Sequence, residues 1–546
     1  MSVVTGLANR LALAGSAVAR TRFERALHDP RSAQNAILMR TVRANAATAF
    51  GREHGFATIR DAAEYARRVP LRDHDETAPW IARVCAGETN VLTADAVRFV
   101  EPTGGSSGYT KHIPYTSSLL GEFSAATMAW IFDLLLHRPA LRAGHAYWAV
   151  TPPGRRSERT EGGVAIGMQH DSDYFPAPIR ALLDRTLAVP RAVGRAPDAD
   201  SCRYLTLRAL LALPDLRMIS VWSPSFLTLL ASALDEHFDR LLHDMDRGTV
   251  SLDLDSDLLA TLARALPAKQ HEARRVRRRF GRTPPQDLGA LWGHLALISC
   301  WTDGHASRAM AGMRQRFPDV EVQGKGLLAT EGAVSIPLFG SGAPVAAVTS
   351  HYLEFLPDGA TDAPRGVDQL DAGAMYEVVL TTGGGLYRYR LRDLVRVEGH
   401  LRRAPLLSFQ GRADRASDLA GEKLTPTLVE LALTSAMRDI GVTAPFAMLA
   451  PTWEPTAHYT LYVEAEPAAA ARLALAVERR LGAAHHYALC RALGQLAPLE
   501  GVAVRGGEHA YERACAERGQ RSGTIKPPAL ESALGWDRHF EACTVA

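Results

Sequence analysis

A loop rich in glycine and hydroxyl side chains, set between a strand-like and a helix-like segment, constrains this chain most. The loop Thr103–Lys111 reads TGGSSGYTK, the apolar segment Val97–Val100 precedes it, and a helical pattern at Tyr115–Leu136 follows. Thr116 or Ser117 is placed to cap that helix. Such a loop suits phosphate, because glycines let the backbone approach an anion, hydroxyls donate hydrogen bonds and a helix N-terminus attracts negative charge.

The loop alone supports two interpretations. As a phosphate site it would act through Ser106, Ser107, Gly108 and Lys111. It is not a Walker loop, because His112 follows the lysine where that motif has serine or threonine. A Ser/Gly-rich loop is also a common surface linker, so the choice depends on motifs elsewhere in the chain.

The composition excludes several classes of protein. Of 546 residues, 47% are hydrophobic and 22% are charged, which is typical of a globular protein with several domains. A net charge of +3 indicates neither nucleic acid nor strongly acidic partners. The arginine-rich run 274–279 lacks interleaved aromatic residues, so we expect a solvated helix face there. The six cysteines form no Cys-x-x-Cys pair, so we expect reduced thiols and a cytoplasmic location.

No apolar run approaches the roughly 20 residues that span a membrane, so no membrane association is expected. The apolar stretch Leu11–Val18 is short and alanine-rich, and a charged helical pattern follows it directly. We therefore interpret it as part of an amphipathic first helix rather than a signal peptide. A monomer is the default expectation for the assembly.

Helical and strand-like patterns alternate along the chain and predict an α/β fold. Residues 1–70 read as helices. Strand-like segments follow at Ala146–Val150, Arg217–Trp222, Leu295–Cys300, Ala346–Val348 and Tyr376–Leu380. Strands separated by helical patterns imply a largely parallel sheet. After Arg412 a compact alternation of helix and strand begins, so we predict domains at 1–410 and 411–546 with a hinge near 411–415.

Four further segments carry residue types that phosphate and metal chemistry uses. They are Gly326–Gly332 (GLLATEG), Gly385–Asp393 (GLYRYRLRD), Phe409–Asp414 (FQGRAD) with its continuation to Glu430, and Ser522–Pro527 (SGTIKP). Each has an ordinary structural interpretation, as a helix cap, an exposed strand, a turn or a tail. Their joint order and spacing are much harder to explain in that way.

In this order the segments resemble the adenylate-forming superfamily of acyl-CoA synthetases, luciferases and peptide-synthetase adenylation domains. They look more closely like the Gretchen Hagen, or auxin-responsive, family of acyl acid amido synthetases. That closer resemblance rests on Gly385–Asp393, Tyr376–Val379, Gly87–Leu92, Lys111–Pro114 and Trp222–Pro224. It extends over nearly the whole chain, including Gly51–Phe56 in the helical N-terminus.

The resemblance implies an adenylate-forming enzyme fold, with a large N-terminal α/β domain that contains mixed sheets and a smaller, mobile α+β C-terminal domain. It also implies an ATP- and Mg²⁺-dependent ligase that joins a small carboxylic acid to an amine, typically an amino acid. The carboxylate would attack the α-phosphate, giving an acyl adenylate and pyrophosphate. The amine would then displace AMP and form an amide.

The resemblance also implies roles for residues around the phosphates. The Ser/Gly loop and Lys111 would hold the β- and γ-phosphates of ATP. Glu331 would bind Mg²⁺, a hard cation that takes oxygen ligands and few protein carboxylates, and Thr330 would reach the α-phosphate or the acyl carboxylate. Lys526 would cross from the small domain to the α-phosphate and the acyl oxygen during adenylation.

Nucleoside contacts follow from the same resemblance, with two departures. Asp393 would accept hydrogen bonds from the ribose hydroxyls, Arg412 would contact ribose or phosphate, and Asp414 lies at the superfamily's hinge position. Leu327 stands where the family often has an aromatic residue that stacks on adenine, so apolar contact would replace stacking. Arg392 stands where the family has a glycine before the aspartate, which affects the turn geometry.

The acyl-acid pocket has only weak sequence candidates. They are Met128, Tyr174, Trp222 and Phe226, with Trp130, Phe175 and Tyr204 as further aromatic residues of the same kind. Burial in the core is the ordinary alternative for each of them.

Two other functions fit the same motifs. A CoA ligase of the same fold would differ only in the second nucleophile, and the Ser/Gly loop reads closer to the wider superfamily than to the plant form. A non-catalytic protein that binds a small acid would keep the fold without turnover. The presence of Lys111, Glu331, Asp393 and Lys526 favours an enzyme.

Overall fold

The computed structural model describes residues 3–103, 111–149, 159–167, 185–222, 224–303, 306–413, 417, 419, 422, 424–453, 456–492, 496–518, 520 and 525–540. The helices are α1 (Val3–His28), α2 (Pro30–Ala44), α3 (Ala49–Glu53), α4 (Ala62–Arg68), α5 (His74–Cys85), α6 (Ser117–His137), α8 (Ala199–Leu211), α9 (Pro224–Arg247), α10 (Ser256–Ala265), α11 (Gln270–Phe280), α12 (Ala306–Arg316), α13 (Pro426–Ile440), α14 (Pro467–Leu481), α15 (His485–Ala492) and α16 (Gly507–Glu517). The predicted helical N-terminus is therefore confirmed.

The strands are β1 (Val97–Thr103), β2 (Lys111–Thr116), β3 (His145–Trp148), β4 (Ala165–Ile166), β5 (Leu216–Ser220), β6 (Leu297–Cys300), β7 (Glu321–Gly324), β8 (Ser335–Ile336), β9 (Val345–Ala346), β10 (Tyr352–Pro357), β11 (Arg365–Gly366), β12 (Met375–Thr381), β13 (Tyr389–Leu401), β14 (Ala404–Arg412), β15 (Ala447–Thr452), β16 (His458–Val463) and β17 (Glu500–Ala503). They form sheets of different kinds, so the mixed-sheet fold that the sequence resemblance implied is confirmed.

The prediction of a largely parallel sheet is wrong for the largest sheet. That sheet has seven strands in the order β11-β10-β12-β13-β14-β9-β8, and its neighbours pair antiparallel. Short connections join β12, β13 and β14, and such connections permit only antiparallel neighbours. The second sheet, in the order β3-β5-β6-β7, is parallel throughout. Helices α8, α9 and α12 alternate with its strands, which is the pattern that a parallel sheet requires.

A third sheet, in the order β2-β1-β4, carries the flanks of the Ser/Gly loop. Strand β2 pairs antiparallel with β1, and Lys111 lies opposite Thr103 at the open end of that pair. The predicted helix start is wrong by two residues, because Tyr115 and Thr116 belong to β2. Thr116 nevertheless caps α6 as predicted, since its hydroxyl accepts a 3.1 Å hydrogen bond from the Leu119 amide.

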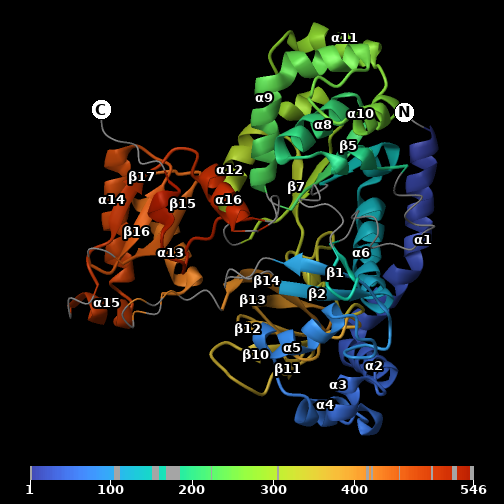
Figure 1. Ribbon diagram of the computed structural model, residues 1–546, viewed down its shortest axis with the longest axis vertical. Coiled ribbons are helices and arrows are strands. Elements are labelled where there is room, and N and C mark those ends of the chain that lie inside the picture. The colour runs from blue at the N-terminus through green and yellow to red at the C-terminus, as the bar shows by residue number, and fades with distance from the viewer. Residues whose placement is uncertain are drawn as a thin grey trace.

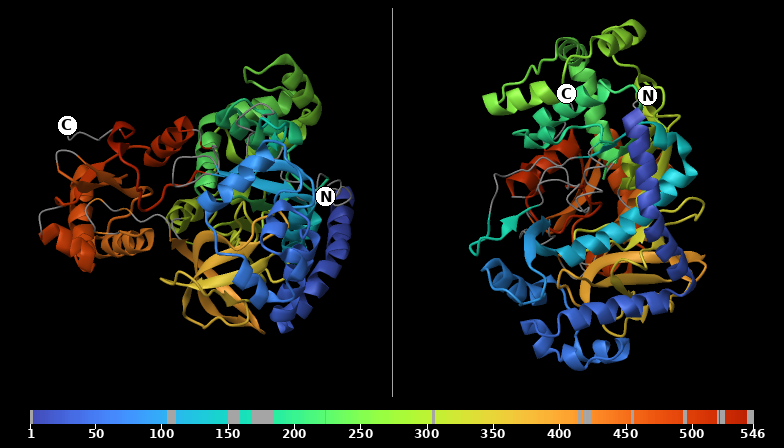
Figure 2. Two further views of the ribbon diagram at one scale, coloured as in Figure 1. Left: turned by 60° about the horizontal axis from the view of Figure 1, so that its bottom comes forward. Right: turned by 90° about the vertical axis from the view of Figure 1, so that its right-hand side faces the viewer.

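Helix α6 is the central helix of the large core. By length and mean hydropathy it could cross a membrane, which corrects the expectation that no segment of this chain would meet that criterion. Most of its residues are buried, and it packs along α1 and against the seven-stranded sheet (Figures 1 and 2). Its apolar composition is therefore explained by its place in the core.

Among the described residues, the first part of the chain has two large cores and a smaller one that lies among α2–α5. One large core joins α1 and α6 to the seven-stranded sheet, and the other large core joins α8, α9, α10 and α11 to one face of the parallel sheet. The helices α8–α11 gather at the top of Figure 1, and the seven-stranded sheet lies below them. The arginine-rich run lies on α11, where its arginines are largely exposed, as predicted.

The C-terminal part has its own small sheet, in the order β15-β16-β17, and its own buried clusters. Helices α13 and α14 cover this sheet, and the whole part lies to one side of the molecule (Figure 1; Figure 2, left). A break after Leu481 separates α14 from α15. The division at 410/411 and the hinge near 411–415 stay predictions.

Candidate active site

Aromatic residues and a lysine gather at the carboxyl edge of the parallel sheet. Trp148 ends β3, Trp222 follows β5, Trp301 follows β6 and Lys325 follows β7. Backbone hydrogen bonds continue past the strand ends, from the Trp301 amide to the Trp222 carbonyl at 2.9 Å and from the Lys325 amide to the Cys300 carbonyl at 3.1 Å. Because the strands are parallel, residues far apart in sequence meet at one edge, which is where ligands bind in open α/β sheets.

We call Trp130, Trp148, Trp222 and Trp301 the tryptophan cluster. The rings of Trp222 and Trp301 lie 5.3 Å apart between centroids, and those of Trp130 and Trp148 lie 5.9 Å apart. Trp130 is buried on α6, and the other three indoles are half-buried. The cluster therefore offers apolar, planar surface at the edge of the sheet.

Lys526 reaches this cluster from the C-terminal part of the chain. Its ammonium lies over the indole ring of Trp301, which in turn packs against Trp222. The structure thus brings together two residues that the sequence analysis proposed separately, Lys526 as a catalytic residue and Trp222 as a pocket residue.

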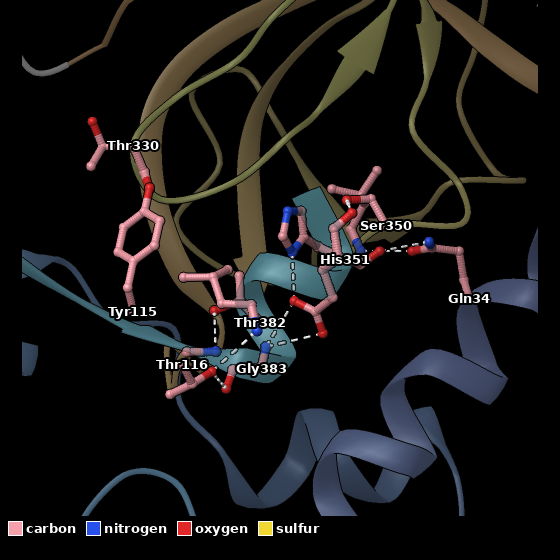
Figure 3. Close-up of polar contacts among 12 residues, drawn as sticks. Gln34, Tyr115, Thr116, Thr330, Ser350, His351, Thr382 and Gly383 are labelled. Atoms are coloured by element: carbon pink, nitrogen blue, oxygen red, sulfur yellow. Dashed lines mark hydrogen bonds and ion pairs between the residues drawn. The ribbon is translucent and has the colours of Figure 1, made fainter. Parts of the chain in front are cut away.

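Thr330 and Glu331 form the tip of a tight hairpin. The Ala329 amide donates to the Gly332 carbonyl at 3.0 Å, and the Gly332 amide donates back to Ala329 at 3.2 Å. The Tyr115 hydroxyl donates to the Thr330 carbonyl at 2.6 Å, which ties the hairpin to β2 (Figure 3). The side chains of Thr330 and Glu331 are half-buried, so they combine fixed positions with access to solvent.

A buried polar network supports the hairpin from below. His351 Nδ1 lies 2.8 Å from Glu122 Oε2, and the Gly383 amide donates to the same carboxylate at 2.9 Å (Figure 3). A Cβ at Gly332 would lie 3.0 Å from the His351 ring, so only glycine fits there without displacing the histidine. The network connects α6, the turn after β12 and the Thr330–Glu331 hairpin.

Lys111 opens β2 beside the N-terminus of α5. Burial and the nearby Lys111 ammonium lower the pKa of His74, the first residue of that helix. The aspartate cap of α5, Asp73, lies 3.4 Å from the guanidinium of Arg392. Lys111, His74 and Arg392 thus bring three basic groups toward the end of the sheet that carries the Ser/Gly loop.

Asp393 is buried on β13, opposite Arg412 of β14. The preceding residue, Arg392, has φ +64° and sits where β13 bulges away from β12. The backbone at this position therefore has a left-handed conformation that favours glycine, although the residue is arginine. Whether the arginine changes the proposed ribose site stays an open question, but its backbone conformation is strained.

Other residues that the sequence predicted for the site do not belong to the tryptophan cluster. Leu327 donates its amide to Ser335 Oγ at 2.9 Å, and its half-buried side chain packs against the core. Met128 is buried in the α6 core, and Phe226 packs against the core of α8–α11. Tyr204 is buried in that same core, where its hydroxyl donates to Asp244 at 2.8 Å, so the ordinary interpretation holds for it. Ser106, Ser107, Gly108, Asp414, Tyr174, Phe175 and the side chain of Arg412 lie outside the described residues.

The described residues do not assemble a dedicated metal cage. Among them, no group of three or more His, Cys, Asp or Glu side chains could hold a metal ion. A single carboxylate at a half-exposed hairpin tip, as Glu331 provides, suits Mg²⁺ that is bound mainly by substrate phosphates and water. The donor set therefore fits the role that the sequence resemblance assigned to Glu331.

Several residues of this region were not predicted from the sequence. Trp148, Trp301, Lys325 and His74 were not singled out, and Tyr115 was placed on a helix. For the residues after β6 and β7, the available signal was their position at the end of a short apolar segment, because such positions converge in a parallel sheet.

Comparisons with known protein families match three segments of this chain. Residues 19–322 match the GH3 family N-terminal domain, residues 345–412 the GH3 family central domain and residues 428–532 the GH3 family C-terminal domain. The chain is 26% identical over 474 residues to the "Probable indole-3-acetic acid-amido synthetase GH3.12" of Oryza sativa subsp. japonica, covering 76% of this chain and 74% of the rice protein.

Two further similarities agree with this match. The chain is 22% identical over 443 residues to the "Jasmonoyl--L-amino acid synthetase JAR4" of Nicotiana attenuata, covering 76% of this chain and 75% of that protein. Its fold superposes with a TM-score of 0.83 on the solved structure "AtGH3.15 acyl acid amido synthetase in complex with 2,4-DB", at 18% identity and 94% coverage of both chains.

Proposed function

This chain belongs to the GH3 family, and we propose that it activates a small carboxylic acid with ATP and transfers the acyl group to an amine, typically that of an amino acid. The names of the similar rice and Nicotiana proteins, both amido or amino acid synthetases, support this reaction class. The structural observation that carries the proposal is the approach of Lys526, from the C-terminal part, to the sheet edge formed by the N-terminal part.

In the first step, a carboxylate oxygen of the acid attacks the α-phosphorus of ATP. A new O–P bond forms, the bond to the β-phosphate oxygen breaks, and pyrophosphate leaves with its electron pair. Lys526 would stabilise the negative charge that builds on the α-phosphate and acyl oxygens, and Lys111 would neutralise the departing phosphates. These residues position the reactants and neutralise phosphate charge, because phosphoryl transfer needs little covalent help from the protein.

The hairpin and β13 would hold the nucleotide. Thr330 would orient the α-phosphate or the acyl carboxylate, and Asp393 would accept hydrogen bonds from the ribose hydroxyls. We also propose ATP contacts for Leu327, Arg412 and the loop residues Ser106, Ser107 and Gly108. Glu331 would hold Mg²⁺, which when bound would offset negative charge on the phosphates.

In the second step, the amine nitrogen attacks the carbonyl carbon of the acyl adenylate. The C–N bond forms, the C–O bond to AMP breaks, and the nitrogen loses a proton to give the amide. We propose that the C-terminal part moves away between the steps, withdrawing Lys526 and opening the edge to the amine. The acyl acid would lie against the tryptophan cluster, with Trp222 as its main contact.

The deciding experiment measures carboxylate-dependent pyrophosphate release from Mg-ATP, across a panel of aryl and fatty acids. Each acid is tested alone, with pooled amino acids and with CoA, and the products are identified by mass spectrometry. Release that rises with amino acids, together with amide products, supports the proposal and identifies both substrates.

Other outcomes select other functions. Pyrophosphate release that needs CoA and yields a thioester would indicate a ligase of the same fold. Binding of ATP or acids without pyrophosphate release, seen as thermal stabilisation, would indicate a binding protein. Either result would overturn the amide reaction.

A further inference from the structure

Glu122 on α6 joins segments that lie far apart in the sequence. The residue is buried, and its two carboxylate oxygens accept hydrogen bonds from the Gly383 amide at 3.1 Å and 2.9 Å. Oε2 also lies 2.8 Å from Nδ1 of His351, which is fully buried. The main-chain carbonyl of Glu122 accepts a further 2.8 Å hydrogen bond from the Ser350 hydroxyl. Because a buried carboxylate is costly without such donors, these contacts fix both partner segments relative to α6.

The first partner segment is the turn between β12 and β13. Thr116, the cap of α6, donates its hydroxyl to the Gly383 carbonyl at 2.9 Å (Figure 3). Both polar groups of the Gly383 backbone are therefore bound by α6 and its cap. A Cβ at Gly383 would lie 2.7 Å from the Cβ of Ser118, so the turn sits directly against the first residues of α6. Strand β13, which carries Asp393, follows this turn and takes its position from it.

The second partner segment is the Thr330–Glu331 hairpin. The ring of His351 lies against it, because a Cβ at Gly332 would lie 3.0 Å from both Nε2 and Cδ2 of that ring. Glu122 holds the other ring nitrogen, so the carboxylate sets the orientation of the imidazole. Gln34 holds the backbone of the histidine, since its side-chain amide donates to the His351 carbonyl at 2.7 Å (Figure 3). The hairpin thus rests on a ring that cannot turn without breaking a buried hydrogen bond.

We propose that Glu122 is a positioning residue that keeps three ATP-contacting segments in fixed relative positions. They are the Ser/Gly loop, whose flank β2 runs directly into α6, the Thr330–Glu331 hairpin, and β13 with Asp393. The inference rests on the proposed function and names the group that aligns its site. ATP would contact all three segments at once, so a displacement of one segment weakens ATP more than a ligand that contacts fewer segments.

The test compares the dissociation constants of Mg-ATP and AMP, measured by isothermal titration calorimetry without any acid substrate. AMP would contact the hairpin and β13 but not the Ser/Gly loop. The ratio of the AMP constant to the Mg-ATP constant therefore measures how well the loop is aligned with the other two segments.

Glu122→Gln keeps the size of the side chain, but its amide nitrogen is a donor where the carboxylate has an acceptor. We expect this variant to lower the ratio about tenfold, because the loop and α6 would shift relative to the hairpin and β13. A loss of stability alone would leave the ratio unchanged.

Gly332→Ala tests the same network from the hairpin side. Its Cβ would press on the His351 ring, and Gly332 has no positive φ, so alanine adds no backbone strain of its own. We expect the ratio to fall about tenfold here as well, because Mg-ATP depends on the position of Glu331 and AMP does not.

The control is Asp244→Asn. Asp244 is a fully buried carboxylate on α9 that accepts hydrogen bonds from the Tyr204 hydroxyl at 2.8 Å and the Ser251 amide at 2.6 Å. It belongs to the core of α8–α11 rather than to the network below the hairpin. This variant should melt at a lower temperature than wild type, while its ratio stays within about twofold of the wild-type value.

Each result supports or overturns the inference. An unchanged ratio in Glu122→Gln, or an equal fall in Asp244→Asn, overturns it and leaves the proposed function standing. If Glu122→Gln does not fold, the ratio in Gly332→Ala decides in the same way. Failure of the wild-type protein to bind Mg-ATP would overturn the proposed function, and this inference with it.

Discussion

The Tyr115 hydroxyl and the Thr330 carbonyl oxygen lie 2.6 Å apart, and this hydrogen bond joins the strand that follows the Ser/Gly loop to the hairpin that carries Glu331. The two residues are separated by 215 positions in the chain. The contact couples the proposed triphosphate site to the proposed α-phosphate and Mg²⁺ site. Catalysis that depends on positioning should be sensitive to such a coupling.

Replacement of Tyr115 by phenylalanine tests this coupling. Loss of one hydrogen bond of about 1 kcal/mol corresponds to roughly a fivefold loss in the adenylation rate. The measurement is the initial rate of ATP–pyrophosphate exchange at saturating acid. Tyr376→Phe is the control, because its hydroxyl accepts a 3.1 Å hydrogen bond from the Asp371 amide, away from the hairpin. Equal rates for Tyr115→Phe and the control would show that the hairpin does not need this contact.

Removal of the Lys526 ammonium should separate the two half-reactions. We expect Lys526→Ala to slow acyl-adenylate formation about 100-fold, the usual effect of losing a group that stabilises developing charge. Amide formation from a chemically prepared acyl adenylate should change far less, because the lysine is proposed to withdraw before that step. Rapid-quench measurements of both steps provide the comparison, with Lys269→Ala as the control. A similar loss in both steps would argue against separate conformations.

The positive φ of Arg392 predicts an unusual order of stability. Arg392→Gly and Arg392→Ala remove the same side-chain contacts with Asp73 and Glu377, but only glycine adopts φ +64° without strain. The glycine variant should be more stable than the alanine variant by about 1 kcal/mol, measured by thermal unfolding. The order should reverse at Arg390, which is not among the residues with positive φ. A more stable alanine variant at position 392 would contradict the backbone strain.

Glu512 predicts a pH dependence of stability. Burial and the Glu508 carboxylate raise the pKa of Glu512 on α16 to about 7, against the opposing effect of Arg203 on α8. The folded protein then holds a proton that the unfolded chain, with an ordinary glutamate pKa, releases. Stability from this group is therefore greatest at low pH and declines as pH rises from about 4.5 to about 7.

The corresponding experiment compares melting temperatures of wild type and Glu512→Gln at pH 5, 6 and 7.5. The wild type should lose more stability than the variant across this range, because glutamine does not titrate. Glu517→Gln on the same helix is the control, since Glu517 is exposed. Parallel pH profiles for wild type and Glu512→Gln would show that Glu512 is ordinarily solvated.

Local sequence patterns predicted much of the secondary structure but not the sheet pairing. The cap of α6 at Thr116 follows from short-range chemistry and was predicted. Strand β2 was missed because Lys111–Thr116 is short and runs directly into an apolar helix, which dominates the local pattern. The antiparallel order of the seven-stranded sheet depends on pairings across the chain that no single segment specifies.

The sequence by itself determined the family and the reaction class. The motifs that contain Lys111, Glu331, Asp393 and Lys526 follow one another in the order that is typical of the family they resemble. Only the tertiary structure decided which side chains meet at the sheet edge. Trp222, Trp301 and Lys325 follow three different strands, and they converge because parallel strands end at a common edge, where α6 adds Trp130. The same long-range packing holds Arg392 in a conformation that its own side chain disfavours.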